Sequence, residues 1–139
     1  MTAGRHRVRV VGLCLAATAY LAAGCQSGNG TTIALPDHGG GARSSDDAQI
    51  EGVVRIDVQA DAPCVWLEEG GLAYQALWPE GFRLRIDDPV AVLDGRGRVV
   101  AEEGQRLVAA GGYRPVGEGP GCPTDAVETV RIGRIESSG

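Results

Sequence analysis

From Ile50 to Ile135 the chain alternates short apolar runs with polar residues and turn signals. No window in this stretch keeps an apolar period of 3.6 residues, whereas several keep a period of two, which is typical of strands with one buried face. Val54, Ile56 and Val58 show the period most clearly, because a polar residue follows each of them. The pattern predicts a single all-β domain.

Turn signals divide this domain into about six to eight short strands. Asp94-Gly95 lies between two apolar runs and predicts a tight hairpin, because these residues adopt positive φ angles at low cost. Pro79-Glu80-Gly81 predicts another turn. The expected strands are 54–58, 64–67, 74–78, 82–86, 90–93, 98–101, 106–110 and 127–135, with a β-bulge at Gly133 that returns Ile135 to the buried face.

We expect these strands to form a small closed or partly closed β-barrel, since closure leaves no unpaired strand edge. Their order suggests an OB-like architecture, although the helix usually found between the third and fourth strands of that fold has no counterpart. The Trp78-Pro79-x-Gly81 turn, the Asp94-Gly95-x-Gly97 hairpin and Gly111-Gly112 with Cys122 resemble a loose group of small actinobacterial secreted or lipidated domains. These motifs are turn chemistry, so the resemblance implies a fold and not an activity.

The N-terminus has the layout of a secretory signal. Three arginines precede an apolar run from Val10 to Tyr20, which is too short to span a membrane as a stable helix. The next five residues, Leu21-Ala22-Ala23-Gly24-Cys25, resemble the lipobox of bacterial lipoproteins, although Leu21 lies one position earlier than is usual. In that family the cysteine receives a diacylglyceryl group, and signal peptidase II cuts just before it.

The resemblance implies that residues 1–24 are removed and that the acylated Cys25 anchors the protein to the outer face of the cell membrane. Two acyl chains on Cys25 would anchor the protein stably, whereas a single chain would hold it only marginally. The alternative is an ordinary cleaved signal, with Cys25 left as a spare thiol.

We expect residues 25–49 to comprise the lipidated cysteine and a disordered tether. Gly, Ser and Asp dominate the composition of the tether. Flexible coil of this length spans roughly 25 to 30 Å. His38 is the last histidine of the chain, and we expect it to be a solvated residue of the tether rather than a metal ligand. The folded domain would then cover 50–136, followed by a tail at 137–139.

Cys64 and Cys122 are the two cysteines left after cleavage and lipidation. We expect them to form one disulfide, because an exported domain folds in an oxidising compartment. A redox or metal pair is the alternative. It requires partners that the sequence does not supply, since neither cysteine belongs to a Cys-x-x-Cys motif or has a histidine beside it.

Charge and composition argue against several classes of function. Without residues 1–24 the net charge is about −8, and the whole chain lacks lysine, so we expect no nucleic-acid partner. The domain also lacks histidine and serine, so the usual nucleophile and base pairs cannot be assembled in it. We predict no enzyme activity, no cofactor and no metal.

Paired acids are the remaining candidates for chemistry. Glu68-Glu69, Asp87-Asp88 and Glu102-Glu103 could each contribute a carboxylate to glycan hydrolysis, which needs two such groups flanking a sugar. Each pair lies at a predicted strand end or turn, where acids are solvated. We therefore favour surface turns over a catalytic dyad.

Aromatic residues offer a candidate binding face. Core packing is the default interpretation, particularly for Trp66 and Phe82. If one rim of the barrel is exposed, a stacking surface for sugar rings or a peptide would form there from Trp78 and Tyr113 with Arg83 or Arg85.

The sequence as a whole predicts a lipid-anchored, extracytoplasmic, non-enzymatic β-domain. It would act as a binding or accessory module for an envelope protein or glycan. A carboxylate-dependent hydrolase of wall polysaccharide is one alternative. A spacer lipoprotein without a specific ligand is the other.

Overall fold

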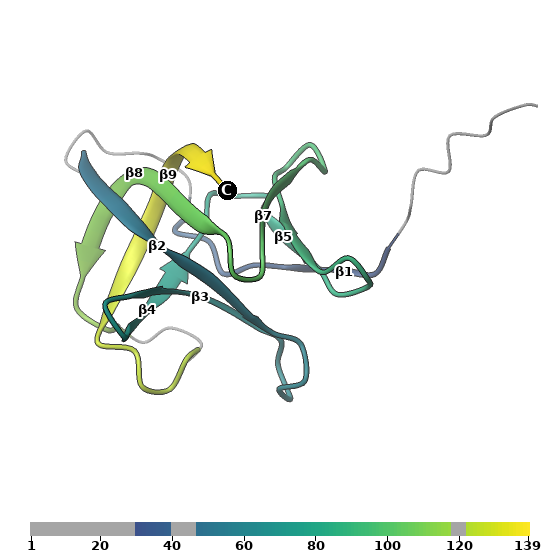
Figure 1. Ribbon diagram of the computed structural model, residues 1–139, viewed down its shortest axis with the longest axis horizontal. Coiled ribbons are helices and arrows are strands. Elements are labelled where there is room, and N and C mark those ends of the chain that lie inside the picture. The colour runs from purple at the N-terminus through teal and green to yellow at the C-terminus, as the bar shows by residue number, and fades with distance from the viewer. Residues whose placement is uncertain (1–29, 40–46, 118–121) are drawn as a thin grey trace, which may run out of the picture.

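The computed structural model describes residues 30–39, 47–117 and 122–139, and nine strands run through them (Figure 1). No helix occurs in these ranges, and so none that could cross a membrane. The prediction of an all-β domain is confirmed. The strands are β1 (Thr32–Ala34), β2 (Ala48–Asp57), β3 (Cys64–Glu69), β4 (Leu72–Leu77), β5 (Arg83–Arg85), β6 (Ala91–Leu93), β7 (Val99–Glu102), β8 (Arg106–Arg114) and β9 (Glu128–Ser138).

Five of these strands close the predicted barrel, in the order β2-β3-β4-β9-β8 and back to β2. All neighbours in the barrel are antiparallel except β4 and β9, which run parallel from Tyr74↔Glu128 to Leu77↔Arg131. The turn between β3 and β4 is tight because Gly70 and Gly71 both have positive φ angles, 59° and 79°. Closure pairs both edges of every barrel strand.

The other four strands form a separate sheet, β1-β5-β6-β7, beside the barrel (Figure 1). Strands β5 to β7 lie in sequence between barrel strands β4 and β8, so the sheet is an insertion that β1 extends. The predicted hairpin at Asp94-Gly95 is confirmed, since β6 pairs with β7 across it. Nine strands exceed the six to eight expected, because β1 lies outside the predicted domain.

The core fills the barrel and continues beneath the inserted sheet. Burial of these side chains is the main favourable contribution to folding, at roughly 25 cal/mol for each Å² of apolar surface. The largest fully buried side chains are Trp78, Ile50, Leu67, Leu84, Leu107, Ile132, Val54, Val92 and Val130. Apart from Trp78, which lies between β4 and β5, all of them belong to strands, where the sequence pattern indicated buried positions.

The bulge predicted at Gly133 is present. Ile135 pairs with Ala109 and Ile132 pairs with Gly111, so two residues of β9 lie opposite one residue of β8. A Cβ atom on Gly133 would lie 2.7 Å from the carbonyl oxygen of Ala110, which leaves no room for a larger residue. Glycine is therefore required by the close approach of β8.

The prediction of a disordered tether is wrong for residues 30–39, because this segment is folded. It contains β1, which pairs with β5, and it buries Leu35 to 5% exposure. A composition rich in glycine pointed to disorder, but three apolar residues at 33–35 are enough to dock the segment on a ready-made sheet. The folded domain also starts earlier than predicted, at Ala48 in β2, and β9 reaches Ser138.

Candidate functional site

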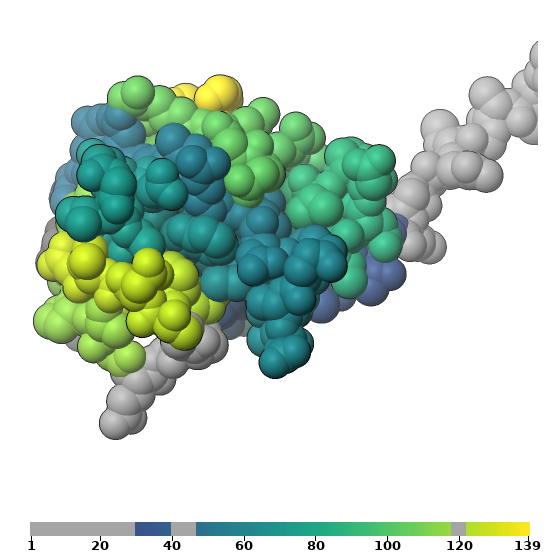
Figure 2. Space-filling view, turned by 60° about the horizontal axis from the view of Figure 1, so that its bottom comes forward, coloured from purple at the N-terminus to yellow at the C-terminus, as the bar shows by residue number. Residues whose placement is uncertain are grey.

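A pocket of about 420 Å³ lies where the barrel meets the N-terminal segment. Its walls come from residues 34–36, from the loop between β2 and β3, from the strands β3 and β4, and from residues 122–124. Figure 2 shows the β2–β3 loop as a lobe that stands out from this side of the molecule. The volume is in the range of small-molecule and peptide side-chain sites.

Gln75 of β4 lies in this pocket and is 3% exposed. Its register partners are Trp66 on β3 and Thr129 on β9, and residues directly opposite in neighbouring strands point to the same face of a sheet. The Thr129 hydroxyl donates to Gln75 Oε1 over 3.0 Å. Gln75 Nε2, however, has no hydrogen-bond partner among the described residues.

An unpartnered buried donor is uncommon in proteins, because its desolvation costs about 1 to 3 kcal/mol. Here the amide sits on the outer face of the barrel wall and is covered by the segments that line the pocket. The arrangement places a free N–H donor in the lining of the pocket. An acceptor atom of a ligand would satisfy it.

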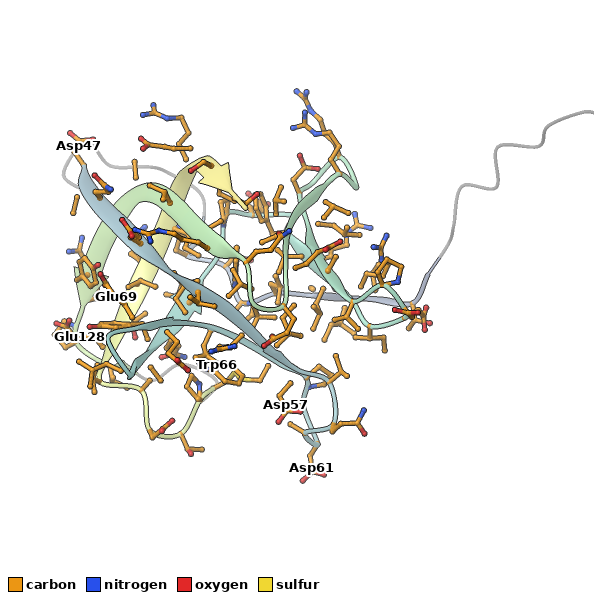
Figure 3. All side chains as sticks on the ribbon, in the orientation of Figure 1. Asp47, Asp57, Asp61, Trp66, Glu69 and Glu128 are labelled. Carbon is orange, nitrogen blue, oxygen red and sulfur yellow. A yellow bond between two sulfur atoms is a disulfide. The ribbon has the colours of Figure 1, made fainter. Side chains whose placement is uncertain are left out.

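Two carboxylates and one aromatic ring lie around the pocket. Asp57, Asp61 and Trp66 gather on the same side of the molecule in Figure 3, and all three line the pocket. Both acids are exposed, whereas Trp66 is half-buried. Asp57 Oδ1 accepts from the backbone N–H groups of Gln59 and Ala60 over 2.8 and 3.2 Å, which fixes the start of the loop.

The ionisable side chains that line this pocket are both acidic. Asp57 and Asp61 are its ionisable lining residues, and no arginine or histidine belongs to the part of the lining that the structure describes. A negative rim favours cationic groups and disfavours phosphate, carboxylate or sulfate in a ligand.

The predicted disulfide forms one wall of the pocket. The sulfur atoms of Cys64 and Cys122 lie at bonding distance, and the two Cα atoms are 5.8 Å apart, within the range that a disulfide requires. The bond ties residues 122–124 to the start of β3. It therefore holds two walls of the pocket at a fixed spacing.

Comparison with known proteins gives no further guide. No protein-family model matches the chain, and neither a curated protein nor a solved structure matches it.

The binding face predicted around Trp78 is corrected by the structure. Trp78 is fully buried, 0% exposed, and stacks on Phe82 with ring centroids 6.0 Å apart, so it cannot form an exposed rim. Tyr113 makes an edge contact with Tyr74, 5.9 Å between centroids, and burial raises the pKa of its hydroxyl.

Nor do the predicted arginines meet Tyr113. Arg83 and Arg85 lie on β5 in the inserted sheet, whereas Tyr113 belongs to barrel strand β8. Arg85 Nε donates to the carbonyl oxygen of Pro89 over 2.7 Å. Alternation predicted which residues share a strand face, but it could not tell which face another segment covers.

The paired acids are surface residues with ordinary contacts. Arg55 forms ion pairs with Glu68 over 3.3 Å and with Glu103 over 3.4 Å, and its pKa is raised chiefly by the hydrogen bond with Glu68. Asp87 accepts a hydrogen bond from the backbone N–H of Thr31. No cluster of metal-ligating side chains occurs within the ranges that the structure describes.

His38 is not the solvated residue that the sequence suggested. It is half-buried, and its Nε2 lies 3.0 Å from the carbonyl oxygen of Ile132. Its Nδ1 lies 3.4 Å from Arg131 Nη2. The adjacent Asp37 forms a backbone bridge with Trp78. These contacts fix the segment that provides the 34–36 wall of the pocket.

Cys25 and the signal peptide lie outside the described residues, so the lipidation site and the anchor stay predictions. Sequence reasoning also missed Gln75. A signal was available: Gln75 is the one polar residue in the apolar run from Tyr74 to Trp78. A buried polar residue in a strand is more informative than an exposed apolar one.

Proposed function

We propose that this protein is a lipid-anchored, extracytoplasmic binding module that holds its ligand in the pocket around Gln75. One observation carries the proposal: Gln75 Nε2 is a buried donor without a partner among the described residues, and it lines a pocket large enough for a ligand. Pockets that are mainly apolar, with few oriented polar groups, are typical of specific binding sites.

An OB-like architecture is part of this proposal, and the barrel topology supports it. OB folds are five-stranded Greek-key barrels that bind ligands on their second and third strands, between the loops that follow the first and fourth strands. The second and third barrel strands here are β3 and β4. The pocket is lined by both, by the loop after β2 and by residues 122–124 of the connection after β8.

The membrane anchor rests on the lipobox-like stretch that ends at Cys25. An anchor of this kind would place the domain at the cell surface, with its ligand among the proteins or glycans of the envelope. The hydrolase and the spacer, which were the alternatives from sequence, have no comparable observation in their favour in the described residues.

Site-specific photocrosslinking in growing cells tests the proposal. A photoreactive phenylalanine derivative is introduced in place of Ala62, which lies on the pocket rim, and in a control in place of Leu72, which is 48% exposed at the other end of the β3–β4 hairpin. We expect a discrete adduct from position 62 only. The adduct should weaken in the Cys25→Ala background, because the domain then leaves the membrane.

A second variant links the adduct to the pocket. The double substitution Gln75→Met with Thr129→Val removes the free donor and its neighbour while keeping their volumes. The adduct from position 62 should then disappear. Equal adducts from positions 62 and 72, or an adduct that survives this double substitution, would contradict the proposed function.

A further inference from the structure

We propose that the ligand is an extended peptide segment with a basic side chain, which pairs with the free edge of β1 inside the pocket. This inference rests on the proposed function, because it names the ligand of the same site. Three features of the described residues support it: the open edge of β1, the free amide of Gln75 and the acidic rim.

The first feature is the direction of the backbone groups of β1. The Leu35 N–H donates to the carbonyl of Phe82 over 3.1 Å, and the Ile86 N–H donates to the carbonyl of Thr31 over 3.0 Å. In an antiparallel pair, residues at alternate positions point toward the partner strand and away from it. Odd-numbered residues of β1 therefore face β5, and Thr32 and Ala34 point the other way.

That other side of β1 is an edge of its sheet. The sheet order is β1-β5-β6-β7, so no strand described in the structure pairs with the N–H and C=O groups of Ala34. This open stretch ends at Pro36, whose carbonyl accepts from the Trp78 N–H over 2.8 Å on the same side. Ala34 also lines the pocket. An unpaired edge with its donor and acceptor exposed is the surface to which extended peptides add as a further strand.

The second feature is the position of Gln75 across the pocket from this edge. Its amide belongs to the barrel wall, whereas Ala34 belongs to the N-terminal segment, and both line the same pocket. A peptide carbonyl is a good acceptor for an amide N–H. A strand paired with Ala34 carries carbonyl groups on both sides, so one of them can face Gln75 Nε2.

The third feature selects the side chain. Asp57 and Asp61 are exposed on the rim, and both hydrogen bonds that Asp57 accepts within its turn use Oδ1. Half-buried Trp66 lines the same pocket and lies on the same side of the molecule (Figure 3). Carboxylates beside an aromatic ring suit a lysine or arginine, through charge attraction and a cation–π contact.

An anionic ligand fits these residues poorly, because the described lining contains no positive charge. A glycan with free amino groups shares the cation but not the backbone pairing with Ala34. The peptide is therefore the occupant that uses all three features, and the amino-sugar oligomer becomes an outcome of the test.

Peptide titrations of the full-length protein test the inference. The probes are capped hexapeptides of alanine and valine that differ in one central residue, either lysine, alanine or glutamate, together with a chitosan oligomer. Fluorescence reports binding, because Trp66 lines the pocket and the other tryptophan, Trp78, is fully buried. We expect the lysine peptide to bind at least tenfold more tightly than the glutamate peptide, with the difference shrinking at high salt.

Charge variants show whether the rim selects the ligand. Asp57→Asn with Asp61→Asn removes two negative charges and keeps an acceptor at the turn, and we expect it to weaken the lysine peptide about fivefold or more. Asp47→Asn with Glu69→Gln removes the same charge away from the pocket (Figure 3) and should change the affinity less than twofold.

Hydrogen exchange separates backbone pairing from charge attraction alone. On peptide addition the amide of Ala34 should exchange at least tenfold more slowly, because pairing protects it. Equal binding of the three peptides, or binding without protection of Ala34, would overturn the inference. Binding of the chitosan oligomer in their place would overturn it and leave the proposed function standing.

Discussion

At the scale of single residues, Gln75 is the feature that the fold does not explain. A methionine at this position would fill a similar volume without burying a free donor, so the amide costs stability that packing does not return. Costs of this kind tend to persist at functional sites. Trp78 Nε1 is the other buried side-chain donor without a partner in the described residues, but Trp78 lies in the core and outside the pocket lining.

The stability of a double variant checks this reasoning. Gln75→Met with Thr129→Val removes a hydrogen-bonded pair together with the free donor. Replacing both partners of a hydrogen bond by apolar groups changes stability little, so the main effect is the relief of the desolvation cost of Gln75 Nε2. We expect the free energy of unfolding to rise by about 1 to 2 kcal/mol in urea titrations with an unchanged m-value. A loss of more than about 1 kcal/mol would show that the amide is structural.

Residue-scale prediction from sequence succeeded where chemistry left few choices. Cys64 and Cys122 were the two cysteines available, and the structure joins them. It failed for the possible binding face, because Trp78, which would have formed part of it, is fully buried. The period of an apolar pattern identifies one face of a strand, but the N-terminal segment that pairs with Trp78 comes from distant sequence.

At the scale of elements, the hairpin between β6 and β7 is the best-specified part of the chain. Asp94 is the residue that fixes its turn. One carboxylate oxygen accepts from the N–H groups of Arg96 and Arg98 over 2.9 and 3.0 Å. The other forms an ion pair with the Arg98 guanidinium at 2.7 Å. These contacts hold the pKa of Asp94 below its usual value, and the hydrogen bond from the Arg98 backbone N–H contributes most.

A lowered pKa makes the stabilisation by Asp94 depend on pH. It is fully present above the carboxyl pKa of the unfolded chain, about 3.9, and it is lost as pH falls through the lower pKa of the folded state. Asp94→Asn should therefore be less stable than the parent at pH 6, and the difference should shrink below about pH 4. Thermal unfolding from pH 2 to pH 7 measures this, with Asp47→Asn as the control. A difference that stays constant across that range would contradict the assignment.

The N-terminal segment is the element that the sequence predicted least well. Its glycines indicated a tether, yet residues 30–39 form a strand and pack His38 on β9. The contact partners are Arg131 and Ile132, more than ninety residues away, so no local pattern could reveal them. The consequence for function is direct, because this segment builds one wall of the pocket.

At the scale of the whole molecule, a small barrel leaves little room for a site in its interior. Its interior is filled by side chains, and the pocket forms outside, where the N-terminal segment, the β2–β3 loop and residues 122–124 meet the wall of β3 and β4. The sequence predicted the all-β class and the barrel, because alternation and turns are local. It could not predict the pocket, whose walls come from four separate stretches of chain.

The disulfide connects the stability of the molecule with this site. It closes a loop of 58 residues, which contributes about 4 kcal/mol in the chain-entropy model. It also anchors residues 122–124 against β3. One bond therefore stabilises the domain and keeps the pocket in shape.

The proposed function requires that a ligand accepts a hydrogen bond from Gln75 Nε2. Nuclear magnetic resonance of the Gln75 side-chain amide, during titration with the lysine hexapeptide, tests it most directly. We expect a downfield shift of one Nε2 proton and slower exchange with water as the peptide binds. Peptide binding that leaves both Nε2 protons unchanged would contradict it.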